Sequence, residues 1–369
     1  SICLPAGFKR RKRAHPDRQR KRTQRDHRMG KPIQTGSGPF FRMRAEENGP
    51  LLFGGEQSEQ HESHRWGLCI PESGQGNFLI VNKGEDSMRI DAHQHFWKIE
   101  RGDYGWLTPD NETLYRDFLP EHLKPWLEKY RMDGTILVQA APTVEETKFL
   151  LQLYRENDFI AGVVGWLDLE SPDFPETFAH FRQQKGFVGI RPMLQDLEDD
   201  RWILRPQVLK HLELVVQADF PLDILVKPRH LPHILELLRI FPMLRGVLDH
   251  IDKPPIADGI LDPWKEHIRE MATFPKVMCK CSGMITEADH QNWKPDDLGP
   301  YIRHVLQVFG TKRIMFGSDW PVCLLAGTYG QVYEAFACHL DGLSESELAD
   351  IFGNNAVRFY KLAPREEGR

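Results

Sequence analysis

The sequence is poor in cysteine and in long apolar runs. Its six cysteines are scattered through 369 residues and form neither a disulfide framework nor a C-x-x-C zinc motif. Cys279 and Cys281 would share one face of a strand, where buried thiols are the ordinary outcome. We therefore expect reduced thiols in a cytoplasmic protein. No apolar run reaches the length of about 18 residues that a membrane span needs, so no membrane partner is expected.

The balance of charge differs sharply between the two ends of the chain. Residues 1–50 hold 14 Lys and Arg against 4 Asp and Glu, whereas residues 51–369 hold 34 against 49. Residues 1–87 lack periodic hydrophobicity, so we expect a disordered basic and polar extension. No apolar segment follows its basic run, as a secretory signal requires. We favour a solvated tail, or translated sequence upstream of a start at Met88, for this extension. The alternative is a nucleic-acid-binding arm or a localisation signal, and no nucleic-acid partner is expected for the rest of the chain.

From Met88 onward, short apolar runs alternate with amphipathic stretches. The amphipathic stretches predict helices, and the apolar runs predict eight strands, at 89–97, 134–141, 160–169, 187–193, 222–227, 244–250, 276–283 and 313–320. The helices are expected at 143–157, 205–219, 230–241, 262–273 and 296–309. This order predicts one α/β domain over residues 88–369, folded as a (β/α)8 TIM barrel. An open doubly wound sheet is the alternative, but no G-x-G-x-x-G follows the first strand.

Chemistry in such a barrel comes from the carboxyl ends of the strands. The stretch "MRIDAHQHFW" contains the first predicted strand, which ends with His93 and His95. These two histidines would face the same side because strand side chains alternate. The sixth strand ends with Asp249 and His250, and the eighth ends at Asp319. Two or three imidazoles with one carboxylate form a plausible ligand set for zinc or a similar divalent ion. For an isolated H-x-H pair, hydrogen-bonded core histidines are the alternative.

Further polar and aromatic side chains end the remaining strands. They are Gln139, Trp166, Asp168, Arg191, Lys227 and Trp320, and we take these six as candidates for binding a substrate. Five of them have an ordinary structural alternative. Arg191 and Lys227 could form salt bridges, the two tryptophans could pack, and Asp168 could cap a loop.

Four segments together resemble a known family. They are "IDAHQHFW", "VLDHIDKP", "FGSDWPVC" and the closing "IFGNNAVRFYKL", and they are similar to the amidohydrolase superfamily. The match is closest to its amidohydrolase-2 branch of sugar lactonases, of the L-fuconolactonase and L-rhamnonolactonase type. The resemblance spans about residues 88–363 and implies a distorted (β/α)8 barrel, carbohydrate catabolism and hydrolysis of a sugar-acid lactone. His93 and His95 match the first-strand pair, His250 the sixth-strand histidine, and Asp319 the eighth-strand aspartate.

Two positions depart from the wider superfamily pattern. Arg191 stands where binuclear members carry a bridging carboxylated lysine, and Lys227 lies where a fifth-strand histidine is expected. We therefore expect no two-metal centre. Two possibilities are left open, namely one divalent ion, with zinc preferred, or catalysis without a metal, because lactones are activated esters.

The resemblance implies a mechanism with named roles. Asp319 would be the general base on water, and His250 would orient that water or polarise the carbonyl. A metal held by His93, His95 and Asp319 would lower the pKa of the water. Without a metal, the imidazoles with Lys227 or Arg191 would stabilise the oxyanion.

The alternative functions on the same scaffold are a dicarboxylate lactone hydrolase and a metal-dependent decarboxylase. A dicarboxylate substrate should require several arginines, and Arg191, Lys227 and Arg229 leave that choice open. A non-catalytic barrel is a third alternative, which the strand-end cluster disfavours. The expected partner is a small-molecule sugar lactone, and a homo-oligomer is an open possibility.

Overall fold

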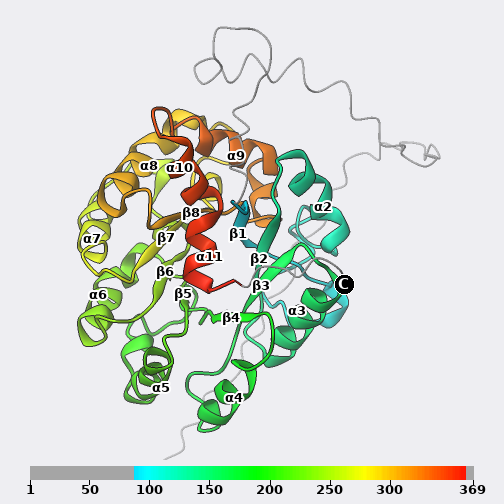
Figure 1. The fold of residues 1–369 in the computed structure, drawn as a ribbon, viewed down its shortest axis with the longest axis vertical. Helices are drawn as coiled ribbons and strands as arrows, with labels where there is room; N and C mark the ends of the chain where they lie inside the picture. The colour runs from blue at the N-terminus through cyan, green and yellow to red at the C-terminus, as the bar shows by residue number, and fades with distance from the viewer. Residues whose placement is uncertain (1–86, 363–369) are drawn as a thin grey trace, which may run out of the picture. The chain divides into compact units, whose positions relative to one another are not determined.

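The computed structural model describes residues 87–362, so the extension expected over residues 1–87 lies outside the described residues apart from Ser87. Eight parallel strands pair in sequence order (Figure 1). They are β1 (Ile90–Gln94), β2 (Gly134–Val138), β3 (Ile160–Gly165), β4 (Phe187–Ile190), β5 (Leu222–Ile224), β6 (Gly246–Leu248), β7 (Met278–Cys281) and β8 (Ile314–Phe316). Every strand lies inside its predicted range, and the predicted barrel is confirmed.

Helices follow the strands, and all except the last lie around the outside of the barrel (Figure 1). They are α2 (Pro120–Lys129), α3 (Val144–Glu156), α4 (Phe174–Phe181), α5 (Pro206–Gln217), α6 (Leu231–Ile240), α7 (Trp264–Met271), α8 (Pro295–Phe309), α9 (Tyr329–Ala337), α10 (Glu345–Ala349) and α11 (Asn355–Tyr360). Several begin with proline, whose fixed φ and missing N–H suit the first helical turn. Within the described range, no helix combines the length and apolar character that crossing a bilayer requires.

Backbone hydrogen bonds just beyond β8 close the barrel. Gln94 and Trp320 form a parallel bridge. The Asp319 amide donates to the His93 carbonyl at 2.8 Å, and the His95 amide donates to the Trp320 carbonyl at 2.7 Å. The ends of the first and eighth strands are therefore fixed against each other, and both carry candidate site residues.

The apolar core has an outer and an inner part. The outer part lies between strands and helices and includes Cys279 and Cys281, which are free buried thiols as predicted. The inner part lies inside the barrel and consists of residues of the strands and of α11, including Ile90, Ala92, Ile136, Val164, Val247, Met278, Met315 and Phe359. Figure 1 shows α11 crossing the end of the barrel. This helix therefore closes the barrel at the end opposite the carboxyl ends of the strands.

A bulge in β1 sets the direction of the first histidine. The register of β1 on β2 shifts between Asp91 and Gln94. Strict alternation from Ile90 and Ala92, which face the inner core, would turn His93 outward. Bulges re-aim side chains in this way and are common beside active sites. The predicted meeting of the two histidines is confirmed, but the bulge, and not the strand period alone, produces it.

Candidate active site

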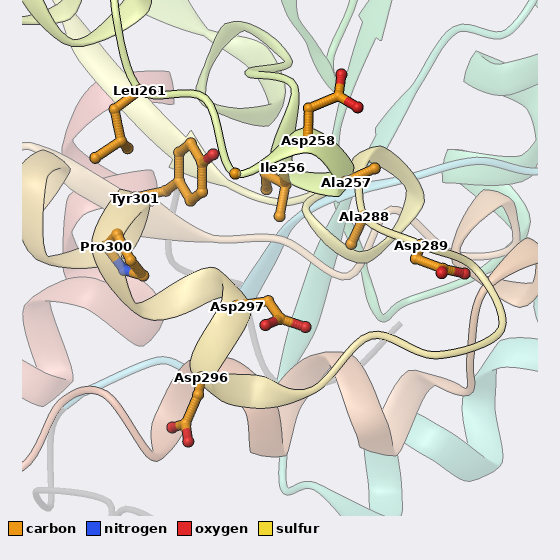
Figure 2. A pocket seen from close by; sticks show the side chains of 11 residues that line it. Ile256, Ala257, Asp258, Leu261, Ala288, Asp289, Asp296, Asp297, Pro300 and Tyr301 are labelled. Atoms are coloured by element: carbon orange, nitrogen blue, oxygen red, sulfur yellow. The ribbon is translucent and has the colours of Figure 1, made fainter.

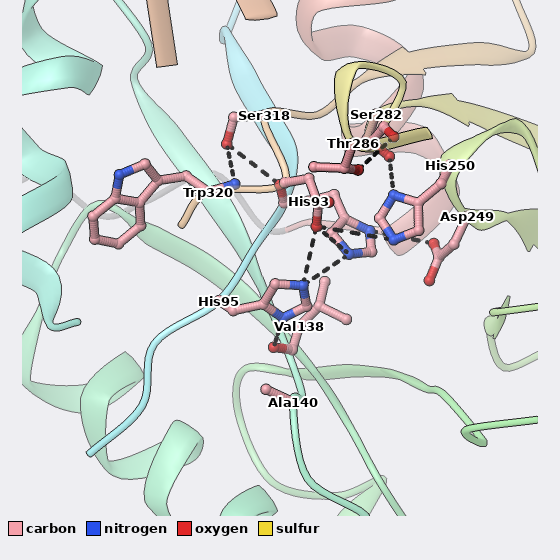
Figure 3. Close-up of polar contacts among 12 residues, drawn as sticks. His93, His95, Val138, Ala140, Asp249, His250, Ser282, Thr286, Ser318 and Trp320 are labelled. Atoms are coloured by element: carbon pink, nitrogen blue, oxygen red, sulfur yellow. Dashed lines mark hydrogen bonds and ion pairs between the residues drawn. The ribbon is translucent and has the colours of Figure 1, made fainter. Parts of the chain in front are cut away.

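Three imidazoles, those of His93, His95 and His250, converge at the carboxyl ends of the strands (Figure 3), and the carboxylate of Asp319 lies among them. His93 Nε2 lies 3.2 Å from His95 Nε2 and 3.8 Å from Asp319 Oδ1. Asp319 Oδ1 is also 3.3 Å from His95 Nε2 and 3.9 Å from His250 Nε2. All four residues are at most 4% exposed. The sequence-predicted cluster of strands 1, 6 and 8 is therefore assembled.

Unusual backbone conformations present two of these side chains. His250 and Asp319 both have φ of 55°, a left-handed conformation that non-glycine residues adopt at some cost in free energy. Two glycines make room for the imidazoles. A Cβ on Gly283 would lie 2.5 Å from His250 Nδ1, and one on Gly317 would lie 2.7 Å from His93 Cβ. Strained residues of this kind concentrate at functional sites.

The second ring nitrogen of each histidine has a partner that fixes the ring. His95 Nδ1 is 2.8 Å from the Val138 carbonyl oxygen, which can only accept, so Nδ1 carries the proton and Nε2 carries a lone pair. His250 Nδ1 lies 3.0 Å from Ser282 Oγ. In both cases Nε2 is the atom that faces the cluster.

His93 has two competing partners on its Nδ1. The Asp249 Oδ1 and Lys280 Nζ atoms each lie 3.3 Å from it. If Nδ1 donates to Asp249, Nε2 is a lone pair suited to a metal. If Lys280 donates to Nδ1, Nε2 holds a proton that can stabilise an oxyanion. The same ring can therefore support either of the two mechanisms left open by the sequence.

Burial sets the charges of the cluster. It lowers the pKa of His93 and of His250 well below the usual range, so both rings are neutral near pH 7. For Asp319, burial alone would raise the pKa, but the imidazoles of His250 and His95 outweigh it and hold the pKa below its ordinary value. An ionised carboxylate thus lies beside the neutral rings of His93 and His250, and its buried Oδ1 accepts no hydrogen bond.

These donors fit a divalent cation. Zinc ligands stand about 2.0–2.2 Å from the ion, so tetrahedral ligand atoms lie about 3.3–3.6 Å apart. The three edges of the predicted set His93, His95 and Asp319 measure 3.2, 3.3 and 3.8 Å. His93, His250 and Asp319 form a second such group, with ligand atoms within 4.8 Å of one another. A buried, unbonded carboxylate oxygen among lone pairs is the arrangement that a cation would stabilise.

A network of buried charged residues in the barrel interior contacts the cluster. Lys280 is 0% exposed and contacts two carboxylates, those of Asp223 and Asp249, the latter at 3.1 Å. Arg191 Nη1 contacts the other Asp249 oxygen at 3.2 Å. The Tyr360 hydroxyl from α11 donates to Asp223 at 2.9 Å. Two cations and two carboxylates therefore offset one another.

The two buried carboxyl groups titrate differently. Burial raises the pKa of Asp223 to about 6, although Lys280 opposes the rise. For Asp249, burial acts in the same direction, but the charge of Lys280 and contacts with His93 and Arg191 hold the pKa well below its ordinary value. Asp249 is therefore a permanent anion behind His93.

Two predicted substrate-binding residues brace each other. The Gln139 amide donates to the Arg191 carbonyl at 3.0 Å, and the Arg191 guanidinium donates to the Gln139 carbonyl. Arg191 Nη1 also lies 3.4 Å from His93 Nε2, at the edge of the cluster. Gln139 and Arg191 are 0% and 3% exposed. Both belong to the wall that supports the histidines.

The other four candidates lie in or just after the carboxyl ends of the strands, the end of the barrel that we call its mouth. Trp320 is 2% exposed, packs edge-to-face against Phe118 at 5.3 Å, and points away from the imidazoles in Figure 3. Trp166 is half-buried and Asp168 is exposed, with a carboxylate oxygen that accepts the Glu170 amide. Lys227 pairs with Asp196 at 3.0 Å. These contacts match the structural alternatives that the sequence left open for Trp320, Asp168 and Lys227.

Sequence reasoning missed several residues that support the site. Asp91 accepts the amides of Ser318 at 2.9 Å and of His93 at 3.2 Å, and so ties β1 to the end of β8. Asp223 holds Lys280 in the barrel interior. A signal was present, because acids and a lysine interrupt otherwise apolar strands, and burial requires such charges to be paired.

A separate hollow of about 460 Å³ lies outside the strand-end cluster (Figure 2). It is lined by Ile256–Gly259 and Leu261, by Ala288 and Asp289, and by the first turns of α8. Its acidic residues include Asp289 and Asp297, which accept backbone amides of their own turns. None of the lining residues belongs to the cluster of histidines.

Comparison with known proteins places the fold and the site in a family. The family model described as Amidohydrolase (Amidohydro_2) matches residues 90–362. The chain belongs to the amidohydrolase family. The match covers the barrel from β1 to the end of α11, and with it all four residues of the cluster.

Several relatives of this amidohydrolase are known. An L-fucono-1,5-lactonase of Burkholderia ambifaria is 42% identical over 75% of this chain and 96% of its own length. An L-fucono-1,5-lactonase of Burkholderia multivorans is 37% identical over 77% and 99%. A crystal structure of a Burkholderia multivorans amidohydrolase with bound zinc superposes with a TM-score of 0.71 at 36% identity, covering 75% of this chain and 100% of that one.

Proposed function

We propose that this amidohydrolase hydrolyses a sugar-acid lactone, such as L-fucono-1,5-lactone or L-rhamnonolactone, to the free acid. The observation that carries the proposal is the buried cluster of His93, His95, His250 and Asp319, which brings the Nε2 atoms of three imidazoles together with one unbonded carboxylate oxygen. The two L-fucono-1,5-lactonases at 42% and 37% identity support the substrate class. The lactone would come from oxidation of a sugar at its anomeric carbon, which suggests a role in carbohydrate catabolism.

Asp319 is the proposed general base. Its low pKa keeps the carboxylate ionised at neutral pH, so it can accept a proton from water as that water attacks the lactone carbonyl. The tetrahedral intermediate then collapses with cleavage of the bond from the carbonyl carbon to the ring oxygen. Asp319 returns its proton to the departing ring oxygen, which becomes the hydroxyl of the product acid.

The imidazoles hold the water and the carbonyl oxygen. His250, fixed through Ser282, orients the attacking water. A divalent ion, when bound by His93, His95 and Asp319, would supply a Lewis acid that polarises the carbonyl and acidifies water. His93, braced by Asp249 and Lys280, keeps its Nε2 directed into the cluster in either tautomer.

The cations near the mouth favour a neutral sugar lactone over a dicarboxylate. Arg191 pairs with Asp249, Lys227 with Asp196, and Arg229 with Asp200 at 2.7 Å. Each of these three positive charges is therefore already offset by a carboxylate. Hydroxyl-bearing substrates need hydrogen bonds and not an excess of positive charge, which fits this arrangement.

A lactone panel tests the proposal. The wild-type chain is mixed with L-fucono-1,5-lactone, L-rhamnono-γ-lactone and a pyrone dicarboxylate lactone, and acid release is followed with a pH indicator. We expect turnover of a sugar lactone well above its spontaneous opening and no turnover of the dicarboxylate. Preference for the dicarboxylate would overturn the proposal.

A second measurement assigns the metal ligands. Zinc content and zinc affinity are compared for the wild type, His95→Ala and His250→Ala. Since the proposed set contains His95, His95→Ala should lose zinc while His250→Ala retains most of it. The opposite result would assign the ion to His93, His250 and Asp319, the second group found in the structure.

A further inference from the structure

An indole near the carboxyl ends of β1 and β2 has no place in the mechanism above. Trp106 lies in the connection between β1 and α2 and is 39% exposed, unlike Trp97, which is fully buried. Its Nε1 donates to the Ala140 carbonyl at 2.8 Å. Its ring packs edge-to-face on Trp97, with centroids 5.4 Å apart and an angle of 84°. One side of the ring is thus held while the rest reaches solvent.

The two residues that hold Trp106, Ala140 and Trp97, lie close in the chain to residues of the cluster or to residues in contact with it. Ala140 lies two residues after Val138, whose carbonyl oxygen contacts His95 Nδ1, and Figure 3 shows Ala140 beside Val138 and His95. Trp97 lies two residues after His95 along the chain. The indole is therefore placed at the edge of the mouth formed by the ends of β1 and β2.

The surrounding contacts hold this edge rigid. Asp103 accepts hydrogen bonds from Arg101 at 2.6 Å and from Thr143 at 3.0 Å, which pins the connection to the start of α3. The buried Glu146 accepts the Ala140 amide at 3.0 Å. A ring fixed before binding loses little conformational entropy when a ligand stacks on it.

We propose that Trp106 is the platform on which the C–H face of the sugar lactone stacks, and so a residue that determines affinity for pyranose-like rings. The inference rests on the proposed function. With its N–H already bonded to Ala140, the indole offers a ligand mainly an apolar π face. Sugar rings present several C–H bonds on one side, and covering them removes apolar surface of both partners from water.

Stacking predicts a characteristic kinetic change. A platform away from the reacting carbonyl binds substrate and transition state equally, so its loss raises KM and leaves kcat nearly unchanged. We expect Trp106→Ala to raise KM for the sugar lactone about tenfold or more, from the loss of aromatic stacking. Trp106→Phe keeps a ring and should recover most of the affinity.

Tyr115 offers a matched control. It lies in the same connection, is 38% exposed, and makes no ring contact within the part of the chain that the structure describes. Tyr115→Ala should leave KM unchanged. Affinity for the product acid, measured by calorimetry on wild type and variants, gives the same comparison without turnover.

The outcomes separate the two proposals. Turnover of sugar lactones by the wild type decides the proposed function. Weaker binding of lactone and acid by Trp106→Ala, with recovery in Trp106→Phe, supports the platform. Equal affinity of wild type and Trp106→Ala for both molecules overturns it, whatever the catalytic activity.

Discussion

The two ends of the barrel interior differ in chemistry although the same strands build them. Towards the amino ends, Ile90, Ile136 and Met278 form an apolar core that α11 closes. Towards the carboxyl ends, the interior holds the imidazoles, the carboxylates and the fully buried Lys280. On β7 the boundary falls between Met278 and Lys280, two residues apart. Apolar packing is thus concentrated at one end and the catalytic groups at the other.

The comparison also shows what connects the two ends. Tyr360 belongs to the apolar plug, yet its hydroxyl bonds Asp223, which pairs with Lys280. Lys280 in turn contacts Asp249 behind His93. The polar end is therefore supported by a charge network that begins in the apolar end. The substitutions below should distinguish the contributions of the two ends to stability and activity.

The largest effect on stability is expected at Lys280. Lys280→Met leaves the carboxylate of Asp223 buried without its cation and removes one of the two cations beside Asp249, so it should lower the free energy of unfolding by about 3–5 kcal/mol. Chemical denaturation measures the change. Adding Asp223→Asn to this variant removes one uncompensated charge and should restore at least about 1 kcal/mol. A double variant no more stable than Lys280→Met would contradict the network.

A smaller, pH-dependent effect is expected at Glu146, beside the mouth. Burial raises its pKa to about 8, although the Ala140 and Ala141 amides oppose this. The unfolded chain releases this proton near pH 4.5 and the folded chain only near pH 8, so stability falls as pH rises through that window. From about pH 5 to 8, the wild type should lose about 1–3 kcal/mol more than Glu146→Gln. The exposed Glu145 provides the control, since the stability of Glu145→Gln should change with pH as that of the wild type does. If the stability of Glu146→Gln also changes with pH in parallel with the wild type, the raised pKa assigned to Glu146 is refuted.

The smallest effect is expected in the apolar end. Ile136→Val removes one methyl group from the inner core and should destabilise the fold by about 1 kcal/mol. Because Ile136 lies among the residues packed by α11, kcat for the lactone should stay at the wild-type value. A fall in kcat would show that the two ends are less separate than the structure indicates.

The sequence predicts the barrel well because its signals are local. Apolar runs located all eight strands, and strand ends located the histidines and Asp319. Sequence reasoning missed α2 and α4, short helices with proline in the first turn, as well as α9, α10 and the plug formed by α11. Whether an amphipathic segment covers a barrel or plugs it depends on tertiary packing.

The site shows the same division between local and tertiary information. Residue type and position suggested Arg191 and Gln139 as substrate contacts, yet their hydrogen bonds run to each other. The bulge that turns His93 inward has no signature in "DAHQ". Trp106 was missed because it lies in a connection, and only the bond to Ala140 brings it to the mouth.

Hydrolysis of L-fucono-1,5-lactone by Asp319→Asn tests the central claim most directly. The variant keeps the shape of the side chain but cannot accept a proton, so kcat should fall by about a hundredfold to ten thousandfold with an unchanged melting temperature. Asp296→Asn, at an exposed position in α8, should retain full activity. An Asp319→Asn variant that is folded and turns over the lactone at a near wild-type rate would contradict the account.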